Sequence, residues 1–127
     1  MSRFSYMEQE RPVLSARLHG TEGFESVIGE ALVYFLPNGL YITASFSNLP
    51  TSQDIPFHIH EGLLCENAGG HLLEFPDLFS DKSGEASFQL YFDKRTLWEV
   101  SGKPLVLHAK IGGKEQKIAC RLLERVL

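Results

Sequence analysis

Strict alternation of apolar and polar side chains is the feature that most limits how this chain can fold. In residues 40–46 and 86–92, every second side chain is apolar, and those between are Ser, Thr, Gln or Tyr. Side chains of a β-strand alternate between its two faces, so each segment predicts a strand with one face buried. Five further runs have a composition typical of strands: residues 13–19, 30–36, 56–60, 105–111 and 118–124.

Turn sequences separate the predicted strands, and no long segment with helical periodicity lies between them. Pro, Gly, Asn and Asp mark these turns, as in residues 37–39, 81–84 and 111–114. The pattern predicts an all-β fold in which about seven or eight antiparallel strands form a sandwich or flattened barrel. The connection over residues 61–84 is long for a compact domain, and we expect it to be one ordered functional loop.

Length and composition restrict the class of protein. The 127 residues suffice for one domain, expected over residues 12–127, with residues 1–11 as a loose N-terminal extension. No stretch is apolar enough to span a membrane, and the first residues lack the apolar core of a secretory signal, so we expect a cytoplasmic location. The net charge of -4 argues against nucleic acid as a partner. Residues 94–127 differ, because their eight basic and three acidic side chains could guide a small anion.

Four of the five histidines are placed to hold a metal ion. His58 and His60 are two residues apart on a predicted strand, so both side chains point to one face. The alternation of its own strand turns His108 outward as well, and His71 lies in the long connection. Neutral imidazoles suit copper or zinc better than magnesium or calcium. Exposed histidine pairs are also common on strands that bind no metal, so this pattern alone leaves both interpretations open.

The two cysteines, Cys65 and Cys120, also have two interpretations. In a cytoplasmic chain, two cysteines are more often free thiols than a disulfide. Cys65 precedes His71 in the same connection, and Cys120 lies in the last predicted strand. A bridge between them would tie the connection to the sandwich and restrict the movement of His71.

The order of these motifs resembles that of the copper/zinc superoxide dismutase family, from about residue 13 to the end of the chain. Residues 57–61, Phe-His-Ile-His-Glu, are similar to the family's copper motif, and residues 65–71 to its Cys-x-x-x-Gly-x-His stretch. Further segments match in the same order: residues 76–78, 83–86, 106–108 and 118–120. The resemblance implies a Greek-key β-sandwich and a disulfide between the two cysteines.

The resemblance also implies a cofactor and an activity. It assigns one copper ion to four histidine ligands, which are His58, His60, His71 and His108. The implied enzyme disproportionates the superoxide anion to oxygen and hydrogen peroxide, and His71 detaches from the reduced copper and takes up a proton. Zinc could substitute for copper in the same site, because imidazole ligands accept either metal.

Two departures from the family pattern resemble its copper-only branch. Of the four family zinc ligands only His71 and Asp77 remain, and Glu74 stands where a zinc histidine is expected, so no complete separate zinc site is expected. The segment between His108 and Cys120 is short for the charged loop that the family carries there. In the copper-only branch a glutamate supports the mobile histidine, so Glu74 is expected to hydrogen-bond His71, and Asp77 to secure the connection.

A third departure concerns the anion-guiding arginine, whose position is occupied by Lys117. Lysine keeps the positive charge but lacks the planar donors of guanidinium, so superoxide would be attracted with a less defined orientation. Arg121 is expected to lie on the same face of the strand as Lys117 and to substitute for it in part in attracting the anion. The expected catalytic residues are therefore His71, Glu74 and Lys117.

Two other functions compete with the dismutase. A non-enzymatic copper-binding protein on the same fold would keep the four histidines and lack fast turnover, which the missing arginine and the short loop favour. A structural β-sandwich would bind no metal. The match between the positions of the four histidines and those of the family would then be a coincidence. The expected partner is the superoxide anion, without nucleic acid or membrane, and the chain could form a homodimer.

Overall fold

The computed structural model describes residues 11–126, and these form the all-β fold that the sequence predicts. The N-terminal extension expected over residues 1–11 lies outside the described residues, apart from Arg11. The strands have these bounds: β1 Leu14–His19, β2 Ile28–Leu36, β3 Gly39–Ser47, β4 Asp54–Ile55, β5 Phe57–His60, β6 His71–Glu74, β7 Leu78–Phe79, β8 Ala86–Asp93, β9 Pro104–Ile111, β10 Lys114–Leu122 and β11 Glu124–Arg125.

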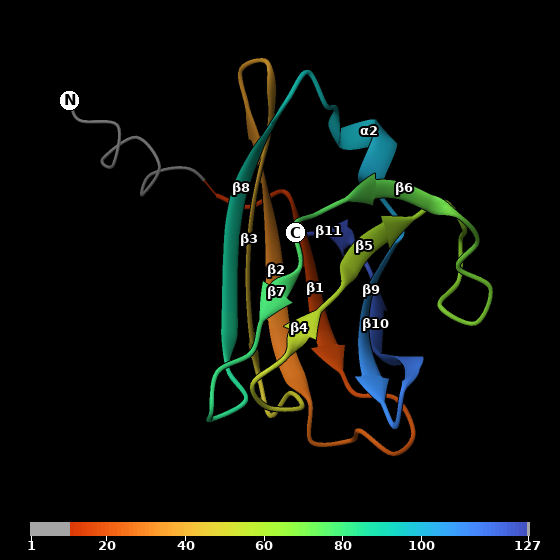
Figure 1. Ribbon diagram of the computed structural model, residues 1–127. Coiled ribbons are helices and arrows are strands. Elements are labelled where there is room, and N and C mark those ends of the chain that lie inside the picture. The colour runs from red at the N-terminus through yellow and green to blue at the C-terminus, as the bar shows by residue number, and fades with distance from the viewer. Residues whose placement is uncertain (1–10, 127) are drawn as a thin grey trace.

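Two antiparallel sheets face each other in a sandwich (Figure 1). The five-stranded sheet has the order β11-β1-β2-β3-β8, and the four-stranded sheet has the order β10-β9-β5-β6. A small third pairing joins β4 to β7. The helix α2, Leu97–Val100, has a single turn and lies between β8 and β9 in the chain. Within residues 11–126, no helix is long or apolar enough to cross a membrane.

Every strand predicted from the sequence is present, but the expected count of seven or eight is too low. The described residues hold eleven strands, of which β4, β7 and β11 have only two residues each. A two-residue strand leaves no periodic signal in a sequence, because alternation needs at least four positions. The Greek-key connectivity stays a prediction.

The connection over residues 61–84 is not one loop, contrary to expectation. It contains β6, which pairs with β5, and β7, which pairs with β4. The sequences of these strands, His-Leu-Leu-Glu and Leu-Phe, do not alternate. Their strand geometry comes from hydrogen bonding to a neighbouring strand that is distant in sequence, which local pattern cannot reveal.

The last long strand begins earlier than the alternation predicts. Gly112 and Gly113 have φ values of 60° and 84°, which suit a two-residue hairpin turn, and this turn pairs Ile111 with Lys114. The first half of β10 is therefore strand although residues 114–117 are all polar. Its alternation is then interrupted, since the register with β9 shifts between Lys117 and Ala119.

An aromatic cluster fills the core beneath β5. Phe57 is fully buried, and its ring stacks on Phe75 at 4.2 Å between centroids. Phe88 meets Phe57 edge to face at 5.0 Å, and Phe46 lies 6.1 Å away on the same sheet as Phe88. Because Phe57 belongs to one sheet and Phe88 to the other, this cluster joins the two layers directly under the strand that carries His58.

Truncation of the central ring tests this description of the core. We expect Phe57→Ala to lower the free energy of unfolding by about 3–5 kcal/mol, because it leaves a cavity between the two sheets. Urea denaturation of the metal-free protein measures the change. The control is Phe35→Ala, whose side chain is exposed on β2 and whose loss should cost less than about 0.5 kcal/mol. Equal effects of the two substitutions would contradict the assigned core.

Candidate metal centre

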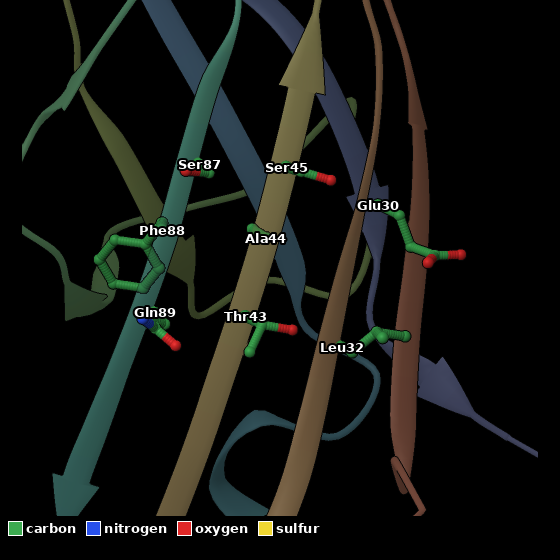
Figure 2. A pocket seen from close by; sticks show the side chains of 8 residues that line it. All are labelled: Glu30, Leu32, Thr43, Ala44, Ser45, Ser87, Phe88 and Gln89. Atoms are coloured by element: carbon green, nitrogen blue, oxygen red, sulfur yellow. The ribbon is translucent and has the colours of Figure 1, made fainter. Parts of the chain in front are cut away.

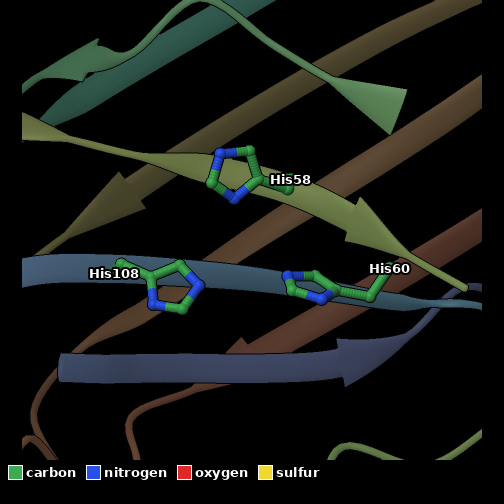
Figure 3. Close-up of side chains that lie close together, drawn as sticks. All are labelled: His58, His60 and His108. Atoms are coloured by element: carbon green, nitrogen blue, oxygen red, sulfur yellow. The ribbon is translucent and has the colours of Figure 1, made fainter. Parts of the chain in front are cut away.

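Adjacent strands of the four-stranded sheet bring three histidines together. β5 carries His58 and His60, and β9, which pairs with β5, carries His108. Phe57 and Ile59 point into the core and are fully buried, so the alternation of β5 turns His58 to the opposite face. Figure 3 shows the three rings converging from the two strands.

The three rings present nitrogen atoms to a common point. One ring nitrogen from each of His58, His60 and His108 lies within 4.8 Å of the others. Two nitrogens bound to one ion at ~2.0–2.1 Å are at most ~4.2 Å apart, so a small contraction would give a shared ligand set. The sequence prediction that these three histidines share one face is confirmed.

Two ring nitrogens of these histidines lack a hydrogen-bond partner. His58 Nδ1 and His60 Nε2 are buried, and neither has a hydrogen bond within the described part of the chain. A buried polar atom without a partner costs about 1–3 kcal/mol, and a bound metal ion would satisfy both atoms at once. The donor set therefore fits a metal ion, and its imidazole chemistry suits copper or zinc.

The other ring nitrogen of His60 has a partner that sets the orientation of its imidazole. His60 Nδ1 lies 2.9 Å from the Gly69 carbonyl oxygen, an arrangement in which Nδ1–H donates and Nε2 keeps its lone pair. His108 Nδ1 lies 3.7 Å from Glu115 Oε1, beyond hydrogen-bond length. Hydrogen bonds to the outer nitrogen fix the tautomer of a metal-binding histidine, so Gly69 serves this purpose for His60.

Glu115 is a residue of the site that sequence reasoning missed. The alternation predicts a strand that begins at residue 118, whereas β10 begins at Lys114, so Glu115 lies outside the predicted strand. The Gly112-Gly113 turn was a usable signal: a two-residue hairpin pairs Glu115 with Lys110 and so places it on the same face as His108.

His71 lies beside the three-histidine cluster but is not a member of it. Its ring stacks on that of His58, with centroids 3.9 Å apart and planes inclined by 20°. Its Nδ1 lies 2.9 Å from Glu74 Oε1, which confirms the predicted contact between His71 and Glu74. The hydrogen bond with His71 lowers the pKa of Glu74, so this carboxyl group stays ionised. The assignment of His71 as a fourth metal ligand stays a prediction.

Asp77 does not secure the connection in the expected way. Its side chain is exposed, and no hydrogen bond of its carboxylate is found among residues 11–126. Its negative charge acts on the site through space, since together with Glu74 it opposes the lowering of the pKa of His58. The connection is held by other groups.

The predicted disulfide is present and anchors the connection to β10. Cys65 and Cys120 are bonded, with Cα atoms 5.9 Å apart. Lys117 Nζ donates a hydrogen bond of 2.6 Å to the carbonyl oxygen of Cys65, and Lys103 Nζ donates one of 2.9 Å to that of Glu61. The segment that supplies the Gly69 carbonyl to His60 is therefore fixed by one covalent bond and two lysines.

Lys117 and Arg121 do not lie on the same face, contrary to expectation. Lys117 pairs with His108 across the β9–β10 ladder and so shares its face. The register shift after Lys117 changes the alternation, and Arg121 pairs with Leu105, a core residue. The Arg121 side chain lies 3.9 Å from Glu124 instead, so Arg121 cannot substitute for Lys117 at the site.

No family model matches this chain, and no curated protein matches it either. Membership of the superoxide dismutase family therefore stays a prediction.

A hollow on the outer face of the five-stranded sheet does not form a second chemical site. Figure 2 shows a shallow hollow on the outer face of the five-stranded sheet, where β3 and β8 carry small polar side chains. Glu30 is the only ionisable residue lining it. A wide, shallow hollow with one charged group lacks the convergent groups of a catalytic pocket.

Burial of the cluster predicts a pH dependence of stability. Desolvation lowers the pKa of both His58 and His108 in the folded protein, and repulsion among the neighbouring histidines adds to the shift. In the unfolded chain these groups titrate near the ordinary value of about 6.5, so protons bind the unfolded state first as the pH falls. We expect the free energy of unfolding of metal-free protein to fall as the pH is lowered through ~6.5, until the folded state is protonated too.

Urea denaturation between pH 8 and pH 5 measures this dependence. The double variant His58→Gln/His108→Gln should show a flatter profile, whereas His19→Gln, at the exposed end of β1, should keep the wild-type profile. A wild-type stability that rises on acidification would contradict the assignment.

Proposed function

We propose that this protein is a copper-dependent superoxide dismutase of the copper-only type. The observation that carries the proposal is the pair of buried, unpartnered nitrogens His58 Nδ1 and His60 Nε2, together with His108, on one face of the sheet. The His71–Glu74 hydrogen bond and the Cys65–Cys120 disulfide support it further, since the same motifs suggested both contacts. One ion is proposed, because His71, Glu74 and Asp77 make a poor zinc site.

Bound copper would supply one-electron chemistry, accepting an electron from one superoxide ion and passing it to a second. His58, His60 and His108 would hold the metal. Their strands are fixed by the sandwich, and His60 is oriented further by the Gly69 carbonyl. Such a rigid ligand set keeps its geometry while the charge at the site changes.

Proton handling is assigned to His71 and Glu74. His71 Nδ1 is paired with the Glu74 carboxylate, so its Nε2 is the nitrogen available to bind the metal or to take up a proton. An ionised carboxylate on Nδ1 stabilises the protonated imidazolium. His71 is partly exposed and lies outside the three-histidine cluster, so the proposed proton transfer takes place beside those ligands and not on them.

Lys117 would contribute positive charge for the superoxide anion. It lies opposite His108 in the β-ladder, and its ammonium group is held at the Cys65 carbonyl. A carbonyl partner does not neutralise the ammonium group, so the charge remains to attract an anion. The group is confined, however, and it lacks the paired donors by which arginine would orient the substrate.

A non-enzymatic copper-binding protein is the competing function. The observation that favours it is the position of His71, which stacks on His58 instead of joining the cluster.

The compartment is a separate proposal. The cytoplasmic location stays a prediction, and the Cys65–Cys120 disulfide is of a kind that persists mainly in oxidising compartments.

Copper content and dismutase activity of one purified sample test the proposal. We expect close to one copper per chain after loading and dialysis, with superoxide dismutation well above that of the apoprotein. His108→Gln should lose most of the bound copper, because two ligands remain, and the control His19→Gln should keep both properties. Bound copper without activity would favour the competing function, and absence of bound copper would overturn both.

Substitution of Glu74 separates proton handling from metal binding. Glu74→Gln should keep its copper but lower kcat by about 10- to 100-fold, because an amide stabilises protonated His71 less well than a carboxylate. Pulse radiolysis measures the rate, and elemental analysis measures the copper. The matched control is Glu22→Gln, which removes an exposed carboxylate from the loop between β1 and β2. Full activity of Glu74→Gln would contradict the role assigned to this residue.

A further inference from the structure

Three of the four edges of the main sheets carry features that block pairing with another strand. β11 has only two residues, both charged. β6 has four residues and carries His71 and Glu74 on its ends. β10 is longer, but its first half carries Lys114, Glu115 and Lys117, and its register is interrupted. Short length, charge and bulges are the devices by which proteins protect sheet edges.

The fourth edge, β8, has none of these protections. It has eight residues in uninterrupted register with β3, and its only charged residue is Asp93 at the end. It contains no Pro, Lys or Arg. Within the described residues β8 pairs with β3 alone, and β7, the nearest segment on its other side, pairs with β4 instead. Figure 1 shows β8 as the outer strand of its sheet.

The inward-pointing side chains of β8 are also less buried than those of the neighbouring strand β3. Phe88, Leu90 and Phe92 have the inward parity, yet all three are only half-buried. On the neighbouring strand β3, the inward-pointing Ile42 and Phe46 are each 2% exposed. The difference arises because no strand among residues 11–126 follows β8 in the sheet, so one side of each apolar side chain remains in water.

We propose that β8 pairs antiparallel with β8 of a second copy about a two-fold axis, which joins two five-stranded sheets into one. A strand pairs with its own copy only in registers that keep the apolar face continuous, since a shift by one residue would put polar side chains opposite apolar ones. Two central registers meet this condition, with either Gln89 or Leu90 on the axis.

Charge favours the register centred on Leu90. With Gln89 on the axis, Glu85 would stand opposite Asp93 of the second copy, and like charges directly opposite are destabilising. With Leu90 on the axis, Asp93 stands opposite Ser87, and Glu85 approaches the basic end of the edge at Lys94 and Arg95. Phe88 then meets Phe92 of the second copy on the inner face, and Gln89 meets Tyr91 on the outer face.

The surroundings of the edge suit a second copy of the chain. The outward side chains of β8 itself, Ser87, Gln89 and Tyr91, are uncharged, so two copies would bring no like charges together there; Figure 2 shows Ser87 and Gln89 on this face. Past the end of the edge, the exposed Phe79 lines a hollow together with Ala86, Ser87 and the acidic Asp81 and Glu85. The histidine cluster lies on the other sheet, so this proposal does not depend on the proposed function.

Sedimentation equilibrium of the full chain at several concentrations tests the proposal. We expect a reversible dimer for the wild type. The double variant Gln89→Lys/Tyr91→Lys places lysines directly opposite each other across the axis, and it should weaken association by at least about tenfold. The matched control, Thr43→Lys/Ser45→Lys, adds the same charge to the same face on the interior strand β3 and should leave the dimer intact. Thermal denaturation verifies that both variants fold.

Amide hydrogen exchange locates the interface independently. In a β8-mediated dimer, amides within residues 86–92 should become protected as the protein concentration rises, and those of β6 and β10 should not change. A wild-type monomer at all concentrations would overturn the proposal, as would a dimer that survives the lysines on β8. Loss of copper binding would not bear on it, so its failure is distinguishable from failure of the dismutase proposal.

Discussion

The antiparallel pairing of β5 with β9 is the interaction on which the candidate metal centre depends. It places His58 opposite Val106, two residues from His108, and so brings residues 50 positions apart in the chain to one face. The pairing is held from below by Phe57, whose ring joins both sheets through Phe75 and Phe88. The chemistry on the outer face is therefore only as rigid as the apolar packing on the inner face.

Two buried nitrogens without hydrogen-bond partners lower the stability of the folded protein, and both belong to the histidine cluster. Ordinary sandwiches pair such atoms or replace them by apolar groups, because each unsatisfied polar atom is unfavourable. Here both unsatisfied atoms, His58 Nδ1 and His60 Nε2, are buried, and they belong to histidines of the same cluster. Concentration of unsatisfied donors and acceptors at one point is the property expected of a ligand-binding site, and it distinguishes this cluster from a chance group of surface histidines.

The two sheets divide the chemistry of the molecule between them. The four-stranded sheet carries the histidines, the disulfide and the lysines that hold the 61–70 segment. The five-stranded sheet carries no comparable cluster within the described residues, but it ends in the unprotected strand β8. A dimer formed through β8 would leave both metal centres open to solvent, because each lies on the sheet that takes no part in the contact.

The amino-acid sequence by itself determined the all-β class, the long strands and the residues available as ligands, because alternation and turn chemistry are local properties. It also determined which face His58, His60 and His108 would occupy, since strand parity follows directly from spacing. Only the tertiary structure decided that 61–84 contains β6 and β7, that β10 brings Glu115 to His108, and that Arg121 is turned away. Each of these depends on the register between strands distant in sequence, and one inserted residue, such as that after Lys117, reverses the faces of everything that follows.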